Sequence, residues 1–176
     1  MSLVGSIERK PYTEEEFSDA RQNLFFVRLS GITRAITRGK KASIQPVNFG
    51  LACCSVELFD LMPTRIDAER WSAMLRSTPK QANVMVVAGW VTKTMMPRIK
   101  RLYEQMDKPR YVIAFGECAV CGGPWWESYN VISGVDQFLP VDVYVAGCPP
   151  RPENLFKAFV KLQKKMGGGV VKNKRK

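Results

Sequence analysis

Four of the five cysteines in the chain are placed so that they can form one metal-binding site. Cys53 and Cys54 are adjacent in FGLACCSVELFD, Cys118 lies in YVIAFGECAVCGGP, and Cys148 lies in VDVYVAGCPPRPE. Each follows a short apolar run that is typical of a β-strand. Thiolates that converge from such positions are usual ligands of zinc and of iron–sulfur clusters. We therefore expect the chemistry of this chain to rest on cysteine.

Spacing alone leaves three interpretations of these thiols open. A [4Fe–4S] cluster has four corners, so an adjacent pair of cysteines can reach two of them. Zinc ribbons use pairs of C-x2-C knuckles, and only Cys118 and Cys121 have that spacing here. Chance buried cysteines are the third interpretation. The spacing favours the cluster, and Cys121 is then surplus: a small buried residue or a free thiol beside the site, unless it replaces one of the four.

The composition excludes histidine chemistry. The chain of 176 residues has no histidine, which removes mixed Cys/His zinc sites, Rieske-type ligation and histidine acid–base catalysis. Its net charge of +11 admits three kinds of partner: nucleic acid, an anionic membrane surface or acidic protein subunits. No apolar run is long enough to span a bilayer and no secretory signal is visible, which predicts a cytoplasmic protein with reduced thiols.

The elements that must position the cysteines are typical of a parallel α/β fold. Apolar runs and helical periodicity predict strands at 44–49, 84–88, 111–115 and 141–145, and helices at 53–62, 67–75, 97–106 and 153–166. This alternation predicts a flavodoxin-like parallel sheet with helices on both faces. The strands end at one edge, where ligands bind, so the four thiols are expected to meet there. Adjacent residues of a strand point to opposite faces, so the tandem pair must sit on a turn or helix start, which Gly50 allows.

We divide the chain into a helical arm at 1–42, an iron–sulfur α/β domain at 43–166 and a basic flexible tail at 167–176. The arm contains a Thr-x-x-Glu capping box that begins at Thr13. We interpret it as an amphipathic helix packed on the domain or on a neighbour, with an arm at a membrane interface as the alternative. The tail, which ends in KNKRK, is interpreted as a solvated end.

Several motifs occur together, and in order, over about residues 48–166. They are GLACC-x2-E, the pair Arg65 and Asp67, S-x-P-x-Q-A, VAG-x-VT-x-K, YE-QM-x-x-PRYVIA-x-G and VDVYV-x-GCPP. The chain thereby resembles the small iron–sulfur subunit of respiratory complex I (its 20 kDa subunit), which is shared with related membrane-bound oxidoreductases and group 4 hydrogenases. The resemblance implies one [4Fe–4S] cluster bound by Cys53, Cys54, Cys118 and Cys148.

The resemblance also implies a function. The chain would be an electron-transfer subunit of a multi-subunit, ion-translocating oxidoreductase, passing electrons to a quinone or a sulfur compound at the interface with a larger subunit. Its partners would be a large catalytic subunit (49 kDa-like or hydrogenase-large-like), an upstream ferredoxin-like iron–sulfur subunit and membrane subunits. These subunits would hold the chain peripherally on the cytoplasmic side of the cell membrane. Nucleic acid is not expected among its partners.

Two alternatives remain. One is the small subunit of a group 4 membrane-bound [NiFe] hydrogenase, although such members usually open with C-x-x-C and this chain has a tandem pair. ECAVCGGPWWESY also departs from complex I proper and resembles an archaeal or ferredoxin-linked branch. The other is a nucleic-acid-binding protein stabilised by a Cys-bound metal, which the charge suggests but the absence of interleaved aromatic and basic residues disfavours.

Five further residues are expected near the cluster. Glu57 lies one helical turn after Cys53. Arg65 matches the family arginine, whose charge would favour the reduced cluster; the alternative is a surface ion pair with Asp67 or Glu69. The remaining three form an apolar helical face that by resemblance borders the quinone pocket, and that is otherwise ordinary core: Leu58, Phe59 and Met62.

Overall fold

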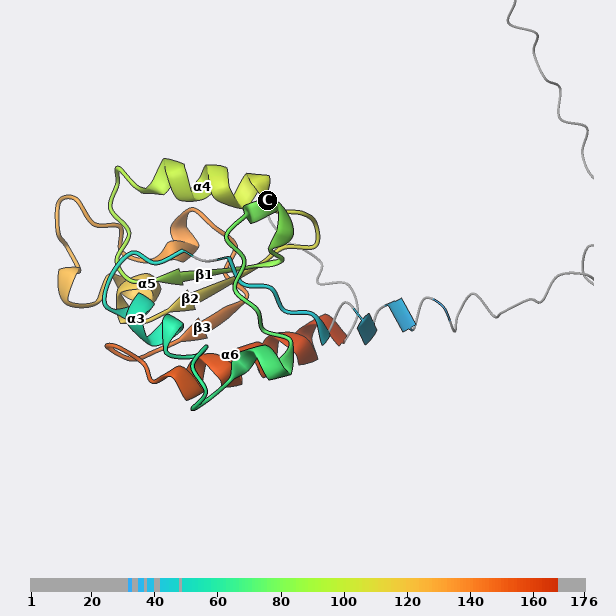
Figure 1. Ribbon diagram of the computed structural model, residues 1–176. Helices are drawn as coiled ribbons and strands as arrows, with labels where there is room; N and C mark the ends of the chain where they lie inside the picture. The colour runs from blue at the N-terminus through green and yellow to red at the C-terminus, as the bar shows by residue number, and fades with distance from the viewer. Residues whose placement is uncertain (1–31, 33–34, 37, 40–41, 48, 168–176) are drawn as a thin grey trace, which may run out of the picture. The chain divides into compact units, whose positions relative to one another are not determined.

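A computed structural model describes residues 32, 35–36, 38–39, 42–47 and 49–167 (Figure 1). Contacts divide the chain into residues 1–36 and residues 37–176, and the fold described here is that of the second unit. The predicted helix that opens at Thr13 and the KNKRK tail lie outside the described residues. The boundaries of the arm, the iron–sulfur domain and the tail stay predictions.

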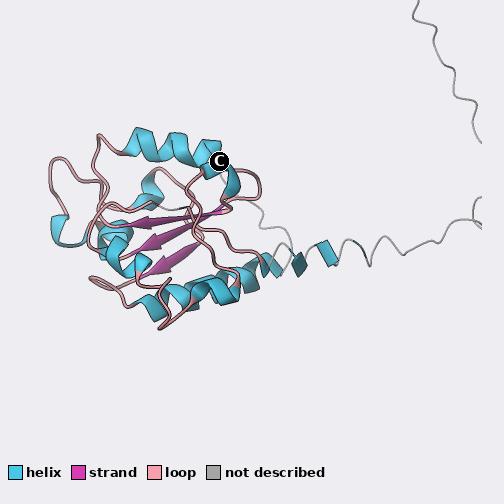
Figure 2. Ribbon diagram, in the orientation of Figure 1, coloured by secondary structure: helices cyan, strands magenta, loops and turns pink. Residues whose placement is uncertain are grey.

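The centre of the fold is a parallel sheet of three strands. They are β1 (Val84–Ala88), β2 (Tyr111–Phe115) and β3 (Val143–Val145), in the order β1-β2-β3 (Figure 2). Val84 is paired with Tyr111, and Ile113 with Val143. Every residue of β1 is buried, as its continuous apolar sequence predicts for a strand covered on both faces. The predicted parallel α/β fold is confirmed.

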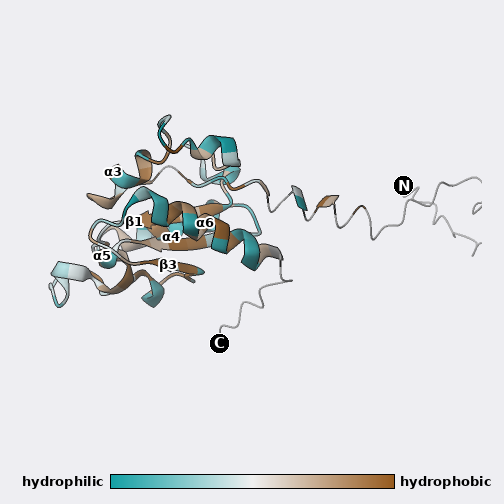
Figure 3. Ribbon diagram, turned by 90° about the horizontal axis from the view of Figure 1, so that it is seen from below, coloured by the Kyte–Doolittle hydropathy of each residue, from teal (hydrophilic) through white to brown (hydrophobic). Residues whose placement is uncertain are grey.

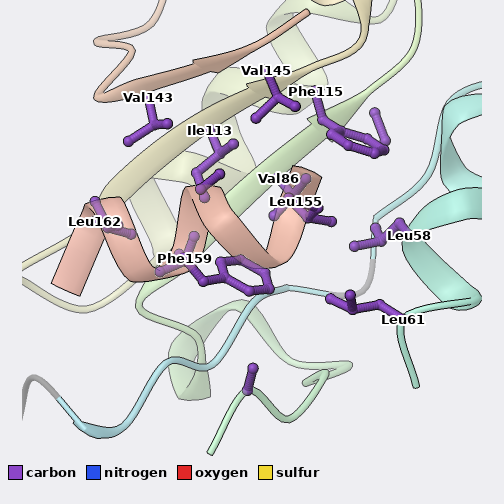
Figure 4. Packing of buried hydrophobic residues seen from close by; sticks show 14 of the residues in the cluster. Leu58, Leu61, Val86, Ile113, Phe115, Val143, Val145, Leu155, Phe159 and Leu162 are labelled. Atoms are coloured by element: carbon purple, nitrogen blue, oxygen red, sulfur yellow. The ribbon is translucent and has the colours of Figure 1, made fainter. Parts of the chain in front are cut away.

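Helices cover the two faces of the sheet. Helix α6 (Pro152–Gly167) lies on one face and α4 (Met96–Gln105) on the other (Figure 1). Side chains of the strands alternate between the two cores, so that Val86 packs in the α6 cluster and Val87 in the α4 cluster. Figure 4 shows the first cluster, where α6 contributes Leu155, Phe159 and Leu162. In Figure 3 the strands are mostly apolar, whereas the helices carry both hydrophilic and apolar residues.

The predicted first strand at 44–49 is wrong as a regular strand. Its described residues form only isolated parallel bridges, among them Pro46 with Val84 and Val47 with Arg76. Proline has no N–H to donate, so Pro46 interrupts the ladder. The segment nevertheless follows the edge of β1, where a strand was expected, and Val47 donates its N–H to the carbonyl of Val84 at 2.9 Å.

The helix predicted at 67–75 is also wrong. Only a 3-10 turn, η1 (Ala68–Trp71), forms there. The residues on either side of it, Asp67 and Ser72, have left-handed backbones with φ of 50° and 64°. A left-handed residue cannot continue a right-handed helix, so η1 is stopped at both ends. The chain then turns back, and Ala73 forms a bridge with Ile44.

The other predicted helices form with changed bounds. Helices α4 and α6 lie within one residue of the predictions at 97–106 and 153–166, and α3 (Cys54–Phe59) is shorter than the predicted 53–62. Pro63 disfavours helical backbone at the preceding residue, which limits α3. Helix α5 (Glu117–Cys121) was not predicted.

Among the described residues, no helix combines the length and the apolar character that crossing a membrane requires.

Asp142 joins β2 to α6, and its removal gives a first prediction. Its Oδ2 accepts a hydrogen bond from the N–H of buried Val112 at 3.1 Å, and its Oδ1 lies 2.8 Å from Nζ of Lys165. Asp142→Ala is expected to lower the free energy of unfolding by about 1–3 kcal/mol, because the N–H of Val112 loses its partner. Lys165→Met is expected to lower it by less than about 1 kcal/mol, because that ion pair is partly exposed. Urea unfolding measures both variants, and equal losses would contradict this assignment.

Candidate metal centre

The carboxyl edge of the sheet is built from glycines. Gly89 follows β1, Gly116 follows β2 and Gly147 lies just past β3, with φ of 119°, 93° and 139°. These angles favour glycine over any residue with a side chain. These glycines also leave no room for a side chain. A Cβ on Gly89 would lie 2.6 Å from Cβ of Ala52, and one on Gly147 would lie 2.7 Å from Cα of Pro150. The cysteine-bearing segments therefore pack directly on the ends of the strands.

The tandem cysteines lie at the start of α3. The N–H groups of Leu51 and Ala52 both donate to the carbonyl of Ala88, the last residue of β1, at 3.2 and 3.3 Å. Helix α3 then begins at Cys54, with Cys53 as its N-cap residue. The predicted turn and helix start at the pair are confirmed. The side chain of Cys54 is buried, whereas Cys53 is exposed.

Cys118 and Cys148 are joined by backbone hydrogen bonds between their segments. The N–H of Gly116 donates to the carbonyl of Val145, and the N–H of Glu117 donates to that of Gly147, each at 2.9 Å. These bonds hold the start of α5, which carries Cys118, beside the loop that carries Cys148. Cys118 is buried and Cys148 is exposed.

Two glycines leave room for the buried thiols. A Cβ on Gly116 would overlap Sγ of Cys54, although the two residues belong to different segments. A Cβ on Gly123 would lie 3.0 Å from Sγ of Cys118. The backbone thus approaches both sulfur atoms as closely as the absence of a side chain allows.

The thiols affect one another electrostatically. Burial, followed by the negative charges of the Cys53, Cys118 and Cys148 thiolates, raises the pKa of Cys54 to about 12. Burial also raises the pKa of Cys118, and Cys148, Cys53 and Glu117 add to that shift. The structure therefore brings Cys53, Cys118 and Cys148 within electrostatic reach of Cys54. Without a bound cation, Cys54 and Cys118 are neutral thiols at pH 7, so binding a metal must release protons.

The donor set fits an iron–sulfur cluster. Four thiols gather at one edge, and such clusters are held by cysteine thiolates alone. Within the part of the chain that the structure describes, no group of three or more cysteine or carboxylate side chains converges on a single metal ion. Cys121 stands apart, because it is exposed, its Sγ lies 3.5 Å from the carbonyl oxygen of Glu117, and it is not among the groups that shift the pKa of Cys54 or Cys118. The alternative that Cys121 is buried is wrong.

Comparison with known proteins identifies the family to which the chain belongs. Residues 52–162 match the family described as NADH ubiquinone oxidoreductase, 20 Kd subunit. The chain belongs to this family. The matched residues begin beside Cys53 and include the segments that carry Cys118 and Cys148, and relatives in this family are subunits of oxidoreductase complexes.

Individual relatives of the 20 kDa subunit family agree with the match. An NADH-quinone oxidoreductase subunit of Amoebophilus asiaticus (strain 5a2) is 50% identical over 128 residues, which are 72% of this chain and 80% of that protein. An NADH-quinone oxidoreductase subunit of Roseiflexus sp. (strain RS-1) is 50% identical over 139 residues, 78% of this chain and 52% of the relative. The chain thus spans about half the length of the Roseiflexus relatives.

Solved structures show the same fold. A chain of the membrane-bound sulfane sulfur reductase, an archaeal respiratory membrane complex, superposes with a TM-score of 0.73 at 37% identity, covering 77% of this chain and 76% of that chain. A chain of an NAD+-reducing [NiFe]-hydrogenase has a TM-score of 0.53 at 16% identity, covering 76% and 98%, and shows the fold alone.

Arg65 is not among the charged groups that affect the buried thiols. Arg65 is exposed on the turn after α3, and no cation is among the groups that shift the pKa of Cys54 or Cys118. The alternative ion pair with Asp67 or Glu69 is also absent from the ion pairs of the described residues. The role of Arg65 near a cluster, by analogy with the family, stays a prediction, as does that of half-buried Glu57.

The predicted apolar face on α3 is divided between core and surface. Leu58 is fully buried in the α6 cluster, and Met62 packs against that cluster. Phe59 is 43% exposed, and the neighbouring Val56 is 67% exposed. Val56 was not predicted, because an apolar residue in a short helix gives no signal that it is exposed. Of the three predicted residues, Phe59 has the surface available for a partner.

Sequence reasoning also missed the glycines that shape the site. Gly89, Gly116 and Gly147 each come one or two residues after a strand. A glycine at the carboxyl end of each predicted strand was a signal, because ligand sites and close backbone approaches occur there. Gly123 carried no such signal.

Proposed function

We propose that the chain is an electron-transfer subunit that carries one [4Fe–4S] cluster on Cys53, Cys54, Cys118 and Cys148. The observation that supports this proposal most is the geometry of the carboxyl edge, where backbone hydrogen bonds and glycines gather the three cysteine-bearing segments on the ends of the strands. When bound, the cluster supplies a one-electron redox centre. The residues of the chain supply the thiolate ligands, and the glycines of the edge let the backbone approach two of the sulfur atoms.

The donor set supports a cluster for a physical reason. Thiolates gathered at one place repel one another, and here that repulsion adds to burial in raising the pKa of two of them. Four iron ions each attract one thiolate, so a cluster offsets the repulsion at all four positions. A single zinc ion needs its thiolates at about 2.3 Å from one centre, which requires closer convergence of the sulfur atoms.

The acceptor is proposed to lie at the interface with a larger catalytic subunit. Relatives are named NADH-quinone oxidoreductase subunits, and a similar chain belongs to a sulfane sulfur reductase, so a quinone or a sulfur compound is proposed as acceptor. Exposed Phe59 and Val56 on α3, beside the tandem cysteines, are the proposed surface toward that subunit. A ferredoxin-like iron–sulfur subunit is proposed as the upstream donor.

Membrane attachment is proposed to be peripheral and through partner subunits on the cytoplasmic side. A similar chain comes from a respiratory membrane complex, and the described helices include none that could cross a membrane. A role as the small subunit of a group 4 [NiFe] hydrogenase is the alternative. Two C-x-x-C pairs in the sequence of the large partner would favour that alternative, and their absence would favour the quinone or sulfur branch.

The test is anaerobic purification of the full chain. We expect about four iron atoms and four sulfide ions per chain, broad absorbance at about 400 nm, and an electron paramagnetic resonance signal after reduction with dithionite. A colourless protein that contains zinc in place of iron would contradict the proposal.

Arg65 gives a further prediction for the redox potential. A guanidinium stays charged at working pH, so near the cluster it favours the reduced form. Because Arg65 is exposed, we take a water-like dielectric, in which one charge at about 6 Å is worth about 0.7 kcal/mol, or about 30 mV for one electron. Arg65→Met is therefore expected to lower the midpoint potential by about 30 mV, while Arg65→Lys lowers it less.

Arg70→Met is the matched control for that titration, because Arg70 is another exposed arginine, on η1. Redox titration of the three variants with intact clusters measures the shifts. Equal midpoint potentials for Arg65→Met and the unmodified protein would show that Arg65 does not lie near the cluster.

A further inference from the structure

Three large aromatic side chains are exposed together on the loop that follows α5. Trp125, Trp126 and Tyr129 are 49%, 63% and 90% exposed. We call residues 123–130 the aromatic loop; the strand arrows in Figure 2 point toward the side of the domain where α5 and this loop lie. Single exposed apolar residues are common, but Trp and Tyr gathered on one surface are typical of binding sites, where they contribute most of the affinity.

The aromatic loop is held in place by hydrogen bonds to the segment that follows β1. The N–H of Lys93 donates to the carbonyl of Asn130 at 2.9 Å, and the N–H of Ile132 donates to that of Val91 at 2.8 Å. The rings of Trp90 and Trp125 meet edge to face with centroids 5.4 Å apart. A surface that is ordered before binding loses little conformational entropy on binding, which favours affinity.

The charge around the aromatic loop has the opposite sign to the charge of the chain. Residues 111–150 contain no lysine or arginine, although the chain has 27 of them. The exposed acidic residues Glu117, Glu127 and Asp136 lie in this stretch, while the fourth acid, Asp142, is paired with Lys165. With Lys93 on the paired segment included, the aromatic loop and its neighbours in the sequence still carry a net negative charge.

This combination selects one class of partner. Exposed Trp and Tyr also occur at membrane interfaces, but peripheral attachment to anionic lipids uses Lys and Arg, which this stretch lacks. Carboxylates also repel nucleic acid phosphates. We propose that the aromatic loop is the docking surface for a protein partner that presents an apolar pocket with a basic rim, because complementary charge guides such contacts.

The location suggests which partner this is. The aromatic loop begins next to Cys118, since a Cβ on Gly123 would lie 3.0 Å from its Sγ. A redox protein seated on this loop would bring its own centre close to the four thiols. The partner is therefore a subunit that exchanges electrons with this chain. That identity rests on the proposed function, whereas the docking surface itself does not.

The test uses the full chain, tagged and expressed in cells that contain the other subunits of the complex. The double variant Trp126→Ser/Tyr129→Ser removes the aromatic surface, and Trp71→Ser/Met74→Ser removes a comparable exposed pair, 58% and 44% exposed, outside the loop. Glu127→Lys/Asp136→Lys reverses the charge. Anaerobic purification in mild detergent, followed by mass spectrometry, measures the amount of each subunit retained per chain. Iron content is measured in the same samples.

We expect the aromatic double variant to retain at least tenfold less of one redox subunit, the charge-reversed variant to lose the same subunit, and the control to retain it. Iron content should stay unchanged in all three. Retention in the aromatic variant equal to that of the control would overturn the inference. An unmodified protein that contains no iron would instead overturn the proposed function, so the two failures are distinguishable.

Binding to vesicles of phosphatidylcholine and phosphatidylserine separates the membrane alternative. We expect the aromatic loop to contribute nothing to vesicle binding. The aromatic variant should therefore sediment with these vesicles to the same extent as the control. If the aromatic variant alone loses vesicle binding and charge reversal strengthens it, the surface is a lipid contact and the protein-docking inference is wrong.

Discussion

Cys54→Ala is expected to leave the chain without a four-iron cluster. Cys54 is 2% exposed, and the other three thiols are among the groups that shift its pKa, so losing it leaves one corner of the cluster without a ligand. The isolated variant should contain no cluster or a three-iron cluster, hence at most about three iron atoms per chain and reduced absorbance at about 400 nm. Iron analysis and the visible spectrum measure this directly.

The fold of that variant should remain. Removing one sulfur atom from a packed site costs about 1 kcal/mol, and the mutual repulsion of the thiols is reduced at the same time. Cys121→Ala is the matched control, because Cys121 is exposed and stands apart from the four. A full complement of iron in Cys54→Ala, or its loss in Cys121→Ala, would show that the ligand set is wrong.

The second large effect is expected at Gly116. This residue has φ of 93° and lies where a Cβ would overlap Sγ of Cys54, so alanine meets both backbone strain and a steric clash. Each effect costs about 1–3 kcal/mol, so Gly116→Ala should lower the free energy of unfolding by about 2–6 kcal/mol. The displaced Cys54 should also reduce the iron content.

Gly39→Ala is the control for that substitution. No atom lies within 4 Å of a Cβ built on Gly39, and its backbone is helical, so alanine should be neutral or stabilising by up to about 1 kcal/mol. Urea unfolding of the metal-free variants and iron analysis after anaerobic purification measure both effects. Gly116→Ala behaving like Gly39→Ala would contradict the close approach of Gly116 to Cys54.

Much of the fold was predictable because the relevant signals are local. The continuous run Val84–Ala88 predicts a strand covered on both faces, and the structure buries all of it. Cysteines placed just after apolar runs predicted their common edge for the same reason, since parallel strands end together. The helix start at Cys54 followed from Gly50 and the need to turn both thiols toward one place.

The rest depended on contacts that no local pattern encodes. Asp67 and Ser72 adopt left-handed backbones, which their residue types do not require, so the predicted helix at 67–75 could not be rejected from sequence. Arg65 was placed near the cluster by resemblance, and its exposure is a property of the turn that carries it. The exposure of the aromatic residues at 123–130 had no signal in the sequence, because apolar residues without periodicity can lie in a core or on a surface.

The most direct test of the central claim is alkylation of the anaerobically purified protein with iodoacetamide, followed by peptide mass spectrometry. Cys53, Cys121 and Cys148 are all exposed in the chain, so exposure alone would allow all three to react. If Cys53, Cys54, Cys118 and Cys148 hold a cluster, only Cys121 is modified, and chelation of the iron makes Cys53 and Cys148 reactive while buried Cys54 and Cys118 react last. Modification of Cys148 or Cys53 in the iron-loaded protein, with Cys121 protected, would contradict the account.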